Sequence, residues 1–283
     1  MEEFIKKADV MLEALPYIQR FRSSVFVVKY GGSFMDSPDP KVRASVASDI
    51  VFLEAVGINP IVVHGGGKAI TAAMEKAGIK ARFVQGLRVT DERSMEIVED
   101  VLGNVINREI VEMIQKLGGK ARGFSGKDVF RCRQLDPKLG YVGEVTSVEV
   151  EPVRKCLRTQ VTPVISPVGL GDDGHSYNIN ADVAAAKLAV TIGARRLVFL
   201  SDVPGLMRDP RNPETLISSL KASEALELKR RGIVDKGMIP KVDSAVEAVQ
   251  AGVRRVHLVD GRTPHSVLLE IFTDKGIGTE IMK

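Results

Sequence analysis

The sequence has no tryptophan, only two cysteines, and aromatic side chains at just 5% of its 283 positions. Cys132 and Cys156 belong to no C-x-x-C motif and have no histidine at ligand spacing, so they predict neither a disulfide framework nor a metal site. The histidines show no metal-ligand spacing among themselves either. We therefore expect two buried thiols and no metal site built by the protein itself.

Long apolar runs and a strong net charge are missing as well. No run of about 18 apolar residues occurs, and the N-terminal MEEFIKKADV is too charged for a signal peptide. The 40 basic and 36 acidic residues leave a net charge of only +4, and no basic stripe is interleaved with aromatic residues. These absences predict a cytoplasmic protein that binds neither a membrane nor nucleic acid.

Short apolar runs alternate with segments of helical period along most of the chain. In the first part, VFVV at 25–28 and IVV at 61–63 predict strands, and helical spacing predicts helices over 41–56, 68–77 and 91–117. Continuous apolar strands between helices are typical of a mainly parallel sheet with helices on both faces. The pattern therefore predicts an α/β fold.

The middle of the chain departs from this alternation. Short alternating stretches at 122–135 and 140–150, separated by glycine, proline and aspartate, predict hairpins. After residue 160 the alternation resumes, with strands expected at 161–168, 196–201 and 253–259 and helices at 181–192, 221–231 and 238–251.

Glycines follow the first two predicted strands directly. VVKYGGS places Lys29 beside Gly31 and Gly32, and IVVHGGGKAI has three glycines before a helix. Glycine allows the backbone to approach another molecule closely, and a helix N-terminus attracts an anion. The HGGG turn matches neither the Walker nor the dinucleotide-binding pattern. Because open α/β sheets bind ligands at the carboxyl ends of their strands, we expect the two turns to flank one anionic group.

Seven motifs, read in order, resemble the amino acid kinase family and together span nearly the whole chain. They are VVKYGGS, VVHGGGKAI, GLRVTD (86–91), SGKD (125–128), YNINAD (177–182), LSDVPGLM (200–207) and GMIPK (237–241). The resemblance implies the amino acid kinase fold, a three-layer α/β/α sandwich with a mainly parallel central sheet. It also implies a substrate lobe with the dimer interface at 23–170 and an ATP-binding lobe at 171–283.

Within that family, GLRVTD resembles most the members that phosphorylate N-acetyl-L-glutamate. The implied reaction moves a phosphoryl group from MgATP to the γ-carboxylate and yields an acyl phosphate, the second step of arginine biosynthesis. A carboxylate with a pKa of about 4.3 is already ionised at neutral pH, so the attack needs no general base. The transfer does need positive charge over the moving group. Magnesium is expected to arrive with ATP and to keep several waters.

The resemblance assigns the catalytic roles to Lys29, Lys241 and Asp182, with Asp182 orienting both lysines. Arg88 is expected to bind the α-carboxylate of the substrate, because a guanidinium presents a planar fork. The other substrate-binding residues implied are Gly66, Gly67 and Asn178. The nucleotide-binding residues implied are Gly31, Gly32, Ser201, Asp202, Gly205, Leu206, Met207, Gly237 and Met238.

Ordinary structural roles stay open for several of these residues. Lys29 and Lys241 would then be solvated surface lysines. Asp182 would be the N-cap of the helix at 181–192, and Asn178 a turn residue.

Two positions depart from the family pattern. Val129 stands where glycine usually follows SGKD, and Lys236 replaces the first glycine of the familiar GGMIPK. We therefore expect the hairpin after Asp128 and the nucleotide loop before Gly237 to differ locally.

The segment before the first strand, residues 1–22, predicts an amphipathic helix that the kinase fold does not need. Its apolar stripe consists of Phe4, Ile5, Ala8, Met11, Leu12 and Leu15. Pro16 predicts a kink or a break in this helix. One expectation is that the helix packs on its own domain.

The resemblance implies a different role for this helix, that of the arginine-inhibited members of the family. In these members, helices of neighbouring dimers interlock into a homohexamer, a trimer of dimers. L-arginine would then bind as an inhibitor near the helix and the segment 260–281, with His265, Glu270 and Gly278 as contacts.

Other functions stay open on the sequence alone. One alternative is a sibling kinase that acts on aspartate, glutamate, carbamate, a nucleoside monophosphate or a carrier-bound aminoadipate. GLRVTD argues against most of these, and the carrier-bound aminoadipate is the hardest to separate because it differs by one methylene and the carrier. Another alternative is a catalytically silent arginine sensor with a regulatory protein partner, against which the intact Lys29, Asp182 and Lys241 argue.

Overall fold

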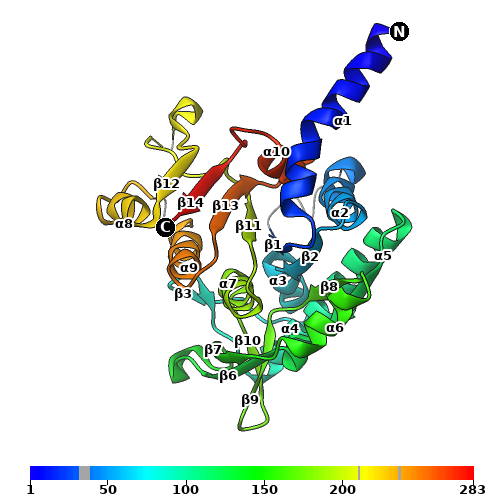
Figure 1. The fold of residues 1–283 in the computed structure, drawn as a ribbon. Helices are drawn as coiled ribbons and strands as arrows, with labels where there is room; N and C mark the ends of the chain where they lie inside the picture. Colours follow the sequence, from blue (N-terminus) through cyan, green and yellow to red (C-terminus); the bar gives the residue numbers. More distant parts are fainter. Residues whose placement is uncertain (32–38, 210, 235–236) are drawn as a thin grey trace.

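A computed structural model describes the chain except for residues 32–38, 210 and 235–236 (Figure 1). A sheet of eight strands lies at the centre of the described residues, and all neighbouring strands run parallel except one pair at 255–260 and 279–282. The predicted mainly parallel sheet is thus confirmed. In order across the sheet, the strands are β12 (Ser219–Lys221), β14 (Thr279–Met282), β13 (Arg255–Asp260), β11 (Arg196–Ser201), β1 (Val25–Tyr30), β2 (Asn59–His64), β8 (Thr162–Ile165) and β5 (Ala121–Phe124).

Helices cover both faces of this sheet, because alternate side chains of its central strands point to opposite sides. Val27 and Phe199 belong to one buried apolar cluster, and Val28 and Val198 to another. The first cluster is closed by α6 (Glu151–Arg158), α7 (Ala181–Ile192), α8 (Ala222–Arg230) and α9 (Ile239–Gln250). The second is closed by α2 (Pro40–Ala55), α3 (Gly67–Lys76), α4 (Glu92–Asp100), α5 (Arg108–Lys116) and α10 (Ser266–Ile271). These layers confirm the α/β/α sandwich.

The long helix expected over 91–117 exists as one helical run with an unexpected middle. Between α4 and α5 the chain forms a π-helix, η2 (Val101–Asn107). Nothing in the apolar spacing predicted this change of helical pitch. π-helical turns often occur at functional sites, and η2 lies against the glycine turn that follows β2.

The expectation of a hairpin at 122–135 is corrected by the structure. Its first part, β5, pairs in parallel with β8 at the edge of the main sheet, because Ala121 and Phe124 are buried there. A second sheet of four strands contains β10 (Ser176–Asn178), β9 (Val168–Gly171), β6 (Phe130–Gln134) and β7 (Gly143–Val148) in that order. Of the two expected hairpins, the antiparallel pair of β6 and β7 is what forms. The remaining short elements are the hairpin β3 (Phe83–Val84) and β4 (Leu87–Arg88), and the 3-10 turns η3 (Gly126–Asp128), η4 (Pro137–Leu139) and η5 (Pro213–Thr215).

The N-terminal helix α1 (Glu2–Phe21) is continuous through Pro16, so of the expected kink or break the break does not occur. Figure 1 shows its first part projecting away from the sandwich. Met11 is 73% exposed and Leu12 63%, whereas Phe21 at the other end is buried. Only the last turns pack on the domain, where the ring of Tyr17 meets that of Phe272. Met11 and Leu12 of the predicted apolar stripe are therefore exposed rather than packed on the domain.

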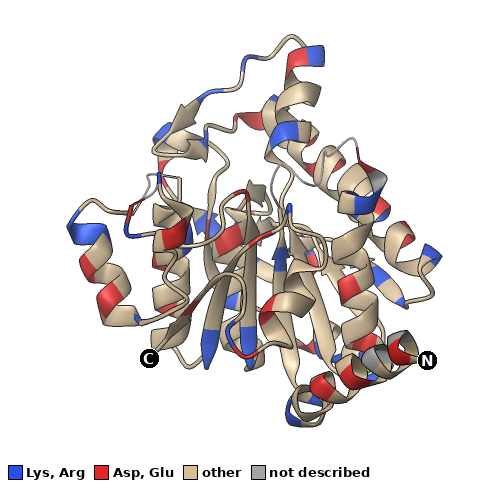
Figure 2. Cartoon of the chain, turned by 90° about the horizontal axis from the view of Figure 1, so that it is seen from above, with Lys and Arg blue, Asp and Glu red and all other residues tan. Residues whose placement is uncertain are grey.

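The distribution of charged residues and the burial of the two cysteines can be compared with the sequence-based expectations. Figure 2 shows basic and acidic residues intermingled over the outer helices and loops in that view. Among the helices that the structure describes, none combines the length and the apolar character that crossing a membrane requires. Cys132 and Cys156 are buried free thiols, as expected.

Candidate functional site

Three charged side chains, two of them buried and one partly buried, meet at the carboxyl ends of the central strands. Lys29 is the penultimate residue of β1, Asp182 lies in the first turn of α7, and Lys241 lies in the first turn of α9. The Nζ of Lys29 is 3.0 Å from Oδ1 of Asp182, and the Nζ of Lys241 is 2.9 Å from its Oδ2. The three side chains are only 9%, 7% and 17% exposed. The lysines are thus not solvated surface residues.

The pKa values of this array reflect burial and mutual attraction. Burial lowers the pKa of Lys29, and the attraction of Asp182 offsets only part of that effect. Burial alone would raise the pKa of Asp182, but the attraction of both lysines outweighs it and holds this pKa below its ordinary value. Asp182 is also not the N-cap of α7, because the Oδ1 of Asn180 accepts the N–H groups at the start of that helix.

A cavity of about 240 Å³ opens beside the array. It brings together all four residues expected to bind the substrate, the two catalytic residues Lys29 and Asp182, and Gly31 of the first glycine turn. Asn178 is therefore a cavity residue at the end of β10, and not merely a turn residue. The residues that line the cavity and were expected at the site are Lys29, Gly31, Gly66, Gly67, Arg88, Asn178 and Asp182.

The glycines at the cavity are required for two different reasons. A side chain at Gly66 would place its Cβ 2.5 Å from Cδ1 of Ile106 and 2.7 Å from Cδ2 of Leu102, both on η2. At Gly67, by contrast, a Cβ would meet no protein atom within 4 Å and would project into open space. Packing thus explains Gly66, whereas access of a ligand to the backbone explains Gly67. The first N–H groups of α3 lie at this wall without helical acceptors, as at any helix start.

Arg88 is held firmly in the cavity wall beside Gly67. Its Nη2 donates to the carbonyl of Gly67 at 2.7 Å and to Oγ1 of Thr71 at 2.8 Å, and its Nη1 donates to Sδ of Met74 at 3.2 Å. The guanidinium also lies 4.8 Å from the ring centre of Phe83. Burial lowers its pKa. A guanidinium has five N–H groups, so two stay available for a ligand.

Thr90 is a site residue that the sequence reasoning missed. Its fully buried hydroxyl donates to the carbonyl of Arg88 at 2.9 Å and accepts Nδ2 of Asn178 at 3.2 Å. The Oδ1 of Asn178 is thereby left for a ligand donor. The position of Thr90 inside GLRVTD, two residues after the expected carboxylate ligand Arg88, was the signal that could have identified it.

Of the expected nucleotide-binding residues that the structure describes, Gly31 lines this cavity, whereas the others lie outside its lining, at the carboxyl end of β11 and before α9. Ser201 ends β11, and Leu206 is held by a hydrogen bond from its N–H to Oγ1 of Thr279 at 2.8 Å. Gly205 has a φ of 152°, and a Cβ there would lie 2.5 Å from that same Oγ1. Gly32 and Lys236 lie outside the described residues. Asp202, Met207, Gly237 and Met238 are described, and their contact with a nucleotide stays a prediction.

The structure separates the three residues expected to bind the effector. Glu270 lines a cavity of about 320 Å³ between α1 and the C-terminal segment. His265 does not line it, and its Nδ1 instead pairs with Oδ1 of Asp49 at 2.8 Å. Gly278 does not line it either, but its N–H donates to Oε2 of Glu270 at 2.8 Å. The sequence reasoning missed His257, which does line the cavity.

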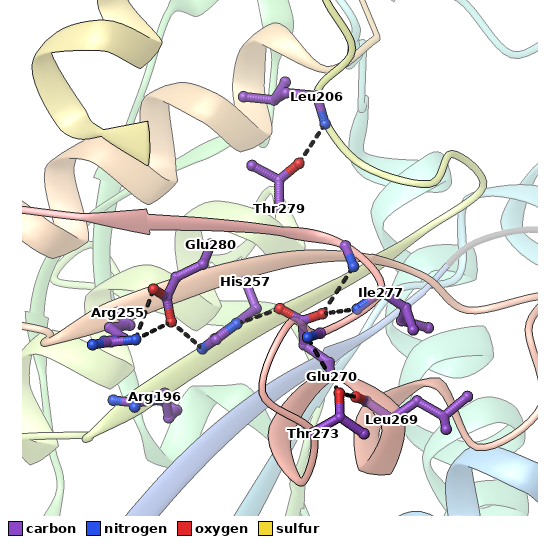
Figure 3. Close-up of polar contacts among 12 residues, drawn as sticks. Arg196, Leu206, Arg255, His257, Leu269, Glu270, Thr273, Ile277, Thr279 and Glu280 are labelled. Carbon is purple, nitrogen blue, oxygen red and sulfur yellow. Dashed lines mark hydrogen bonds and ion pairs between the residues drawn. The ribbon is translucent and has the colours of Figure 1, made fainter. Parts of the chain in front are cut away.

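Charges of both signs surround this second cavity (Figure 3). The Nδ1 of His257 is 2.7 Å from Oε1 of Glu270, and Nη1 of Arg255 donates to both oxygens of Glu280 at 2.6 and 2.7 Å. Burial lowers the pKa of Arg196 to about 10, and its Nε has no partner in the part of the chain that the structure describes. The cavity therefore suits a zwitterion that carries charges of both signs.

Comparisons with a family profile and with curated proteins cover most or all of the chain. The profile of the Amino acid kinase family matches residues 24–260. The acetylglutamate kinase of Heliobacterium modesticaldum is 45% identical over 297 aligned residues, covering 100% of both chains. The acetylglutamate kinase of Syntrophomonas wolfei is 50% identical over 282 residues, covering 98% of each chain.

Solved structures extend the comparison to ligand complexes. An N-acetylglutamate synthase from Neisseria gonorrhoeae, complexed with coenzyme A and N-acetyl-glutamate, superposes with a TM-score of 0.86 at 26% identity. The match covers 98% of this chain and 63% of the synthase chain. The same synthase complexed with coenzyme A and L-arginine has a TM-score of 0.82 at 27% identity, covering 98% and 65%. This chain thus spans less than two thirds of the synthase.

Asp182→Asn should destabilise the protein by about 3–5 kcal/mol near neutral pH, because it leaves buried lysine charges without their partner. It should also lower the pKa of Lys29 further. A lysine with a lowered pKa in the folded state costs stability below that pKa, and the cost fades as pH rises toward the unfolded-state value of about 10.4. The deficit should therefore narrow as pH rises toward about 10.4. Urea unfolding of the variant and the parent protein at several pH values measures this difference in the free energy of unfolding.

The matched control is Asp243→Asn, which removes the partner of Lys229 in a half-exposed pair on the outer side of α9. It should cost less than about 1 kcal/mol. A deficit of Asp182→Asn that stays constant or widens with rising pH would contradict the charge balance described for the array.

Proposed function

The chain belongs to the amino acid kinase family, and we propose that it transfers the γ-phosphoryl group of ATP to the side-chain carboxylate of N-acetyl-L-glutamate. This reaction is the second step of arginine biosynthesis. The observation that carries the proposal is a single cavity lined by Lys29 and Asp182 together with Arg88 and Asn178, with Lys241 paired to Asp182 beside it. Full-length identities of 45% and 50% to acetylglutamate kinases support it.

The array supplies the positive charge that phosphoryl transfer needs. The attacking carboxylate is ionised at neutral pH, and the lowered pKa of Asp182 keeps this group ionised as well, so neither carries a proton. Lys29 lies at the cavity wall and faces the transferring phosphoryl group, while Lys241, on α9, faces the leaving side. Two ammonium groups held by one carboxylate stabilise the shifting negative charge without rearranging during the reaction.

Arg88 and Asn178 hold the amino-acid end of the substrate. The free N–H groups of Arg88 bind the α-carboxylate, and Oδ1 of Asn178 accepts the amide N–H of the acetamido group. A free amino acid would bring an ammonium group into the same place. That charge would lose its hydration and lie near Arg88 and Lys29, which are both cationic. The cavity therefore favours the acetylated over the free amino acid.

ATP is proposed to lie at the carboxyl end of β11, against Ser201, Asp202 and the residues that follow. No group of three histidine, cysteine or carboxylate side chains that could hold a metal ion exists in the described residues. Magnesium is proposed to arrive on the phosphates of ATP and to keep water ligands. Asp202, directly after β11, is the carboxylate proposed to lie near it. Bound there, magnesium would neutralise phosphate charge.

Inhibition by L-arginine is the finer part of the proposal. The second cavity offers Glu270 and Glu280 to a guanidinium and Arg196 to a carboxylate, and Tyr17 of α1 contributes to its wall. The related synthase complexed with L-arginine supports this choice of ligand. The contacts proposed are thus Glu270 and the residues around it, while His265 and Gly278 would act indirectly, by fixing α10 and Glu270.

The exposed stripe of α1 supports a homohexamer, a trimer of dimers joined through these helices. An apolar stripe of this kind is expected to bury itself against a second copy of the chain. Because Tyr17 on the same helix lines the effector cavity, arginine binding and assembly would be coupled. The lobe boundaries, a dimer interface within 23–170, a regulatory protein partner and a cytoplasmic location stay predictions.

The activity is tested by trapping the acyl phosphate as a hydroxamate, with N-acetylglutamate, glutamate, aspartate and N-acetylaminoadipate offered in parallel with MgATP. We expect N-acetylglutamate to react at least about tenfold faster than free glutamate, because a buried ammonium pays for its lost hydration. Equal turnover of the two would contradict the proposal. Faster turnover of N-acetylaminoadipate would favour the sibling kinase, and no ATP turnover with any of them would favour the sensor.

Arg88→Lys should raise the KM for N-acetylglutamate roughly 10- to 100-fold, because an ammonium cannot supply the two remaining N–H groups of the guanidinium together. The KM for ATP should change little. Arg93→Lys, an exposed arginine whose Nη2 only reaches the carbonyl of Ala77, is the matched control and should leave both constants unchanged. Steady-state kinetics decides; a rise in the KM for ATP alone would move Arg88 out of the substrate site.

Deleting residues 1–20 should give active dimers with weakened arginine inhibition, because the catalytic array lies within one protomer. The double variant Met11→Ser and Leu12→Ser alters only exposed stripe residues and keeps Tyr17, so it should form dimers that still bind arginine. Sedimentation and arginine titration of all three proteins measure both properties. A full-length dimer that is indifferent to millimolar arginine would rule out the assembly and the inhibition together.

A further inference from the structure

His64 links the end of β2 to the glycine turn and is completely buried, with 0% of its surface exposed. Its Nδ1 lies 3.0 Å from the carbonyl oxygen of Gly65, and its Nε2 lies 3.2 Å from Nδ2 of Asn107. The same Nδ2 donates to the carbonyl of Val164 on β8 at 2.9 Å. Asn107 is the last residue of the π-helix η2. The imidazole thus connects the glycine turn to η2, and Asn107 connects it further to β8.

These hydrogen bonds allow only one arrangement of protons. A carbonyl oxygen can only accept, so Nδ1 of His64 must carry the ring proton that it donates to Gly65. For the same reason, the group of Asn107 that faces Val164 must be its NH₂, whose second hydrogen points to Nε2 of His64. Nε2 therefore accepts and the ring is neutral. Burial agrees with this state, because it lowers the pKa of His64 to about 4.

The fixed imidazole sets the direction of a backbone N–H at the active site. In a planar trans peptide the C=O and the N–H point in opposite directions, and the described chain has no cis peptide. Holding the carbonyl of Gly65 toward the buried ring turns the N–H of Gly66 the other way, toward the cavity that both glycines line. Leu102 and Ile106 of η2 pack against Gly66 so closely that no side chain would fit there. The π-helix thus supports both the turn and its hydrogen-bonded histidine.

We propose that His64, held as the neutral Nδ1–H tautomer by Asn107, is a positioning residue that aims the Gly66 N–H at the reacting oxygens. This inference rests on the proposed phosphoryl transfer, in which that N–H stabilises charge on the transferred group or on the attacking carboxylate. A neutral histidine suits this position because it donates on one side of the ring and accepts on the other. The π-helical pitch of η2 suits this role because it directs Leu102, Ile106 and Asn107 to the glycine turn and its histidine.

Two substitutions of His64 separate positioning from core filling. The amide nitrogen of asparagine can take the place of Nδ1, so His64→Asn can still donate to Gly65. The longer glutamine places its amide near the position of Nε2, so His64→Gln can contact Asn107 but not Gly65. We expect His64→Asn to keep kcat within about fivefold and His64→Gln to lose roughly 10- to 100-fold, part of the effect of losing one such donor.

Asn107→Leu removes the hydrogen bond to Nε2 of His64 and the one to the carbonyl of Val164, while keeping a similar volume. It should lower kcat roughly 10- to 100-fold and leave the KM for ATP within about twofold. Asn104→Ala, an exposed residue of the same π-helix that bonds only to Asp100, is the matched control and should leave kcat unchanged. Nitrogen NMR of the ring should show the Nδ1–H tautomer in the parent protein and a mixture in Asn107→Leu.

The outcomes distinguish this inference from the proposed reaction. Thermal unfolding of each variant gives the folded fraction, to which kcat is corrected. Losses of kcat that simply follow that fraction, equal kcat in His64→Asn and His64→Gln, or an Nε2–H tautomer in the parent protein would each overturn the positioning role. A parent protein that shows the Nδ1–H tautomer but does not phosphorylate N-acetylglutamate would instead refute the proposed substrate.

Discussion

The carboxylate of Asp182 is shared by two buried lysines, and the geometry of the site depends on it. Its oxygens lie 3.0 Å from Nζ of Lys29 and 2.9 Å from Nζ of Lys241. Without the carboxylate, two like charges would face each other away from water, which is strongly unfavourable. The three residues come from β1, α7 and α9, so the array exists only when both helices pack on the first strand. Burial of apolar side chains thus creates the concentration of charge.

A second constraint acts on the backbone beside that array. The turn between β2 and α3 has to stay free of side chains, at Gly66 because η2 packs against it and at Gly67 because a ligand must reach the chain. The same π-helix brings Asn107 to His64. The segment after the hairpin of β3 and β4 brings Thr90 to Arg88 and Asn178. Residues that touch the cavity are therefore oriented by a layer of buried polar groups behind them.

The accuracy of the sequence-based predictions varied with the range of the interaction involved. The helix expected at 181–192 and the strand expected at 196–201 are observed with those bounds, because local apolar periodicity and turn residues determine them. The strand β5 was assigned to a hairpin, since its short alternating pattern does not tell which neighbour it pairs with. The pitch of η2 was not predicted either, because it results from packing on Gly66 and from the bonds of Asn107.

By itself, the sequence determined the family, the alternation of strands and helices outside the middle of the chain, and which residue types gather at the carboxyl ends of the strands. These properties are carried by motifs of a few residues and by periodicity along the chain. Only the tertiary structure decided that Thr90 orients Asn178, that Glu270 pairs with His257 rather than with His265, and that Asn107 holds His64. Each of these contacts joins residues at least 13 positions apart. Hydrogen bonds of buried groups depend on distance and direction in space, and no local pattern of residues encodes them.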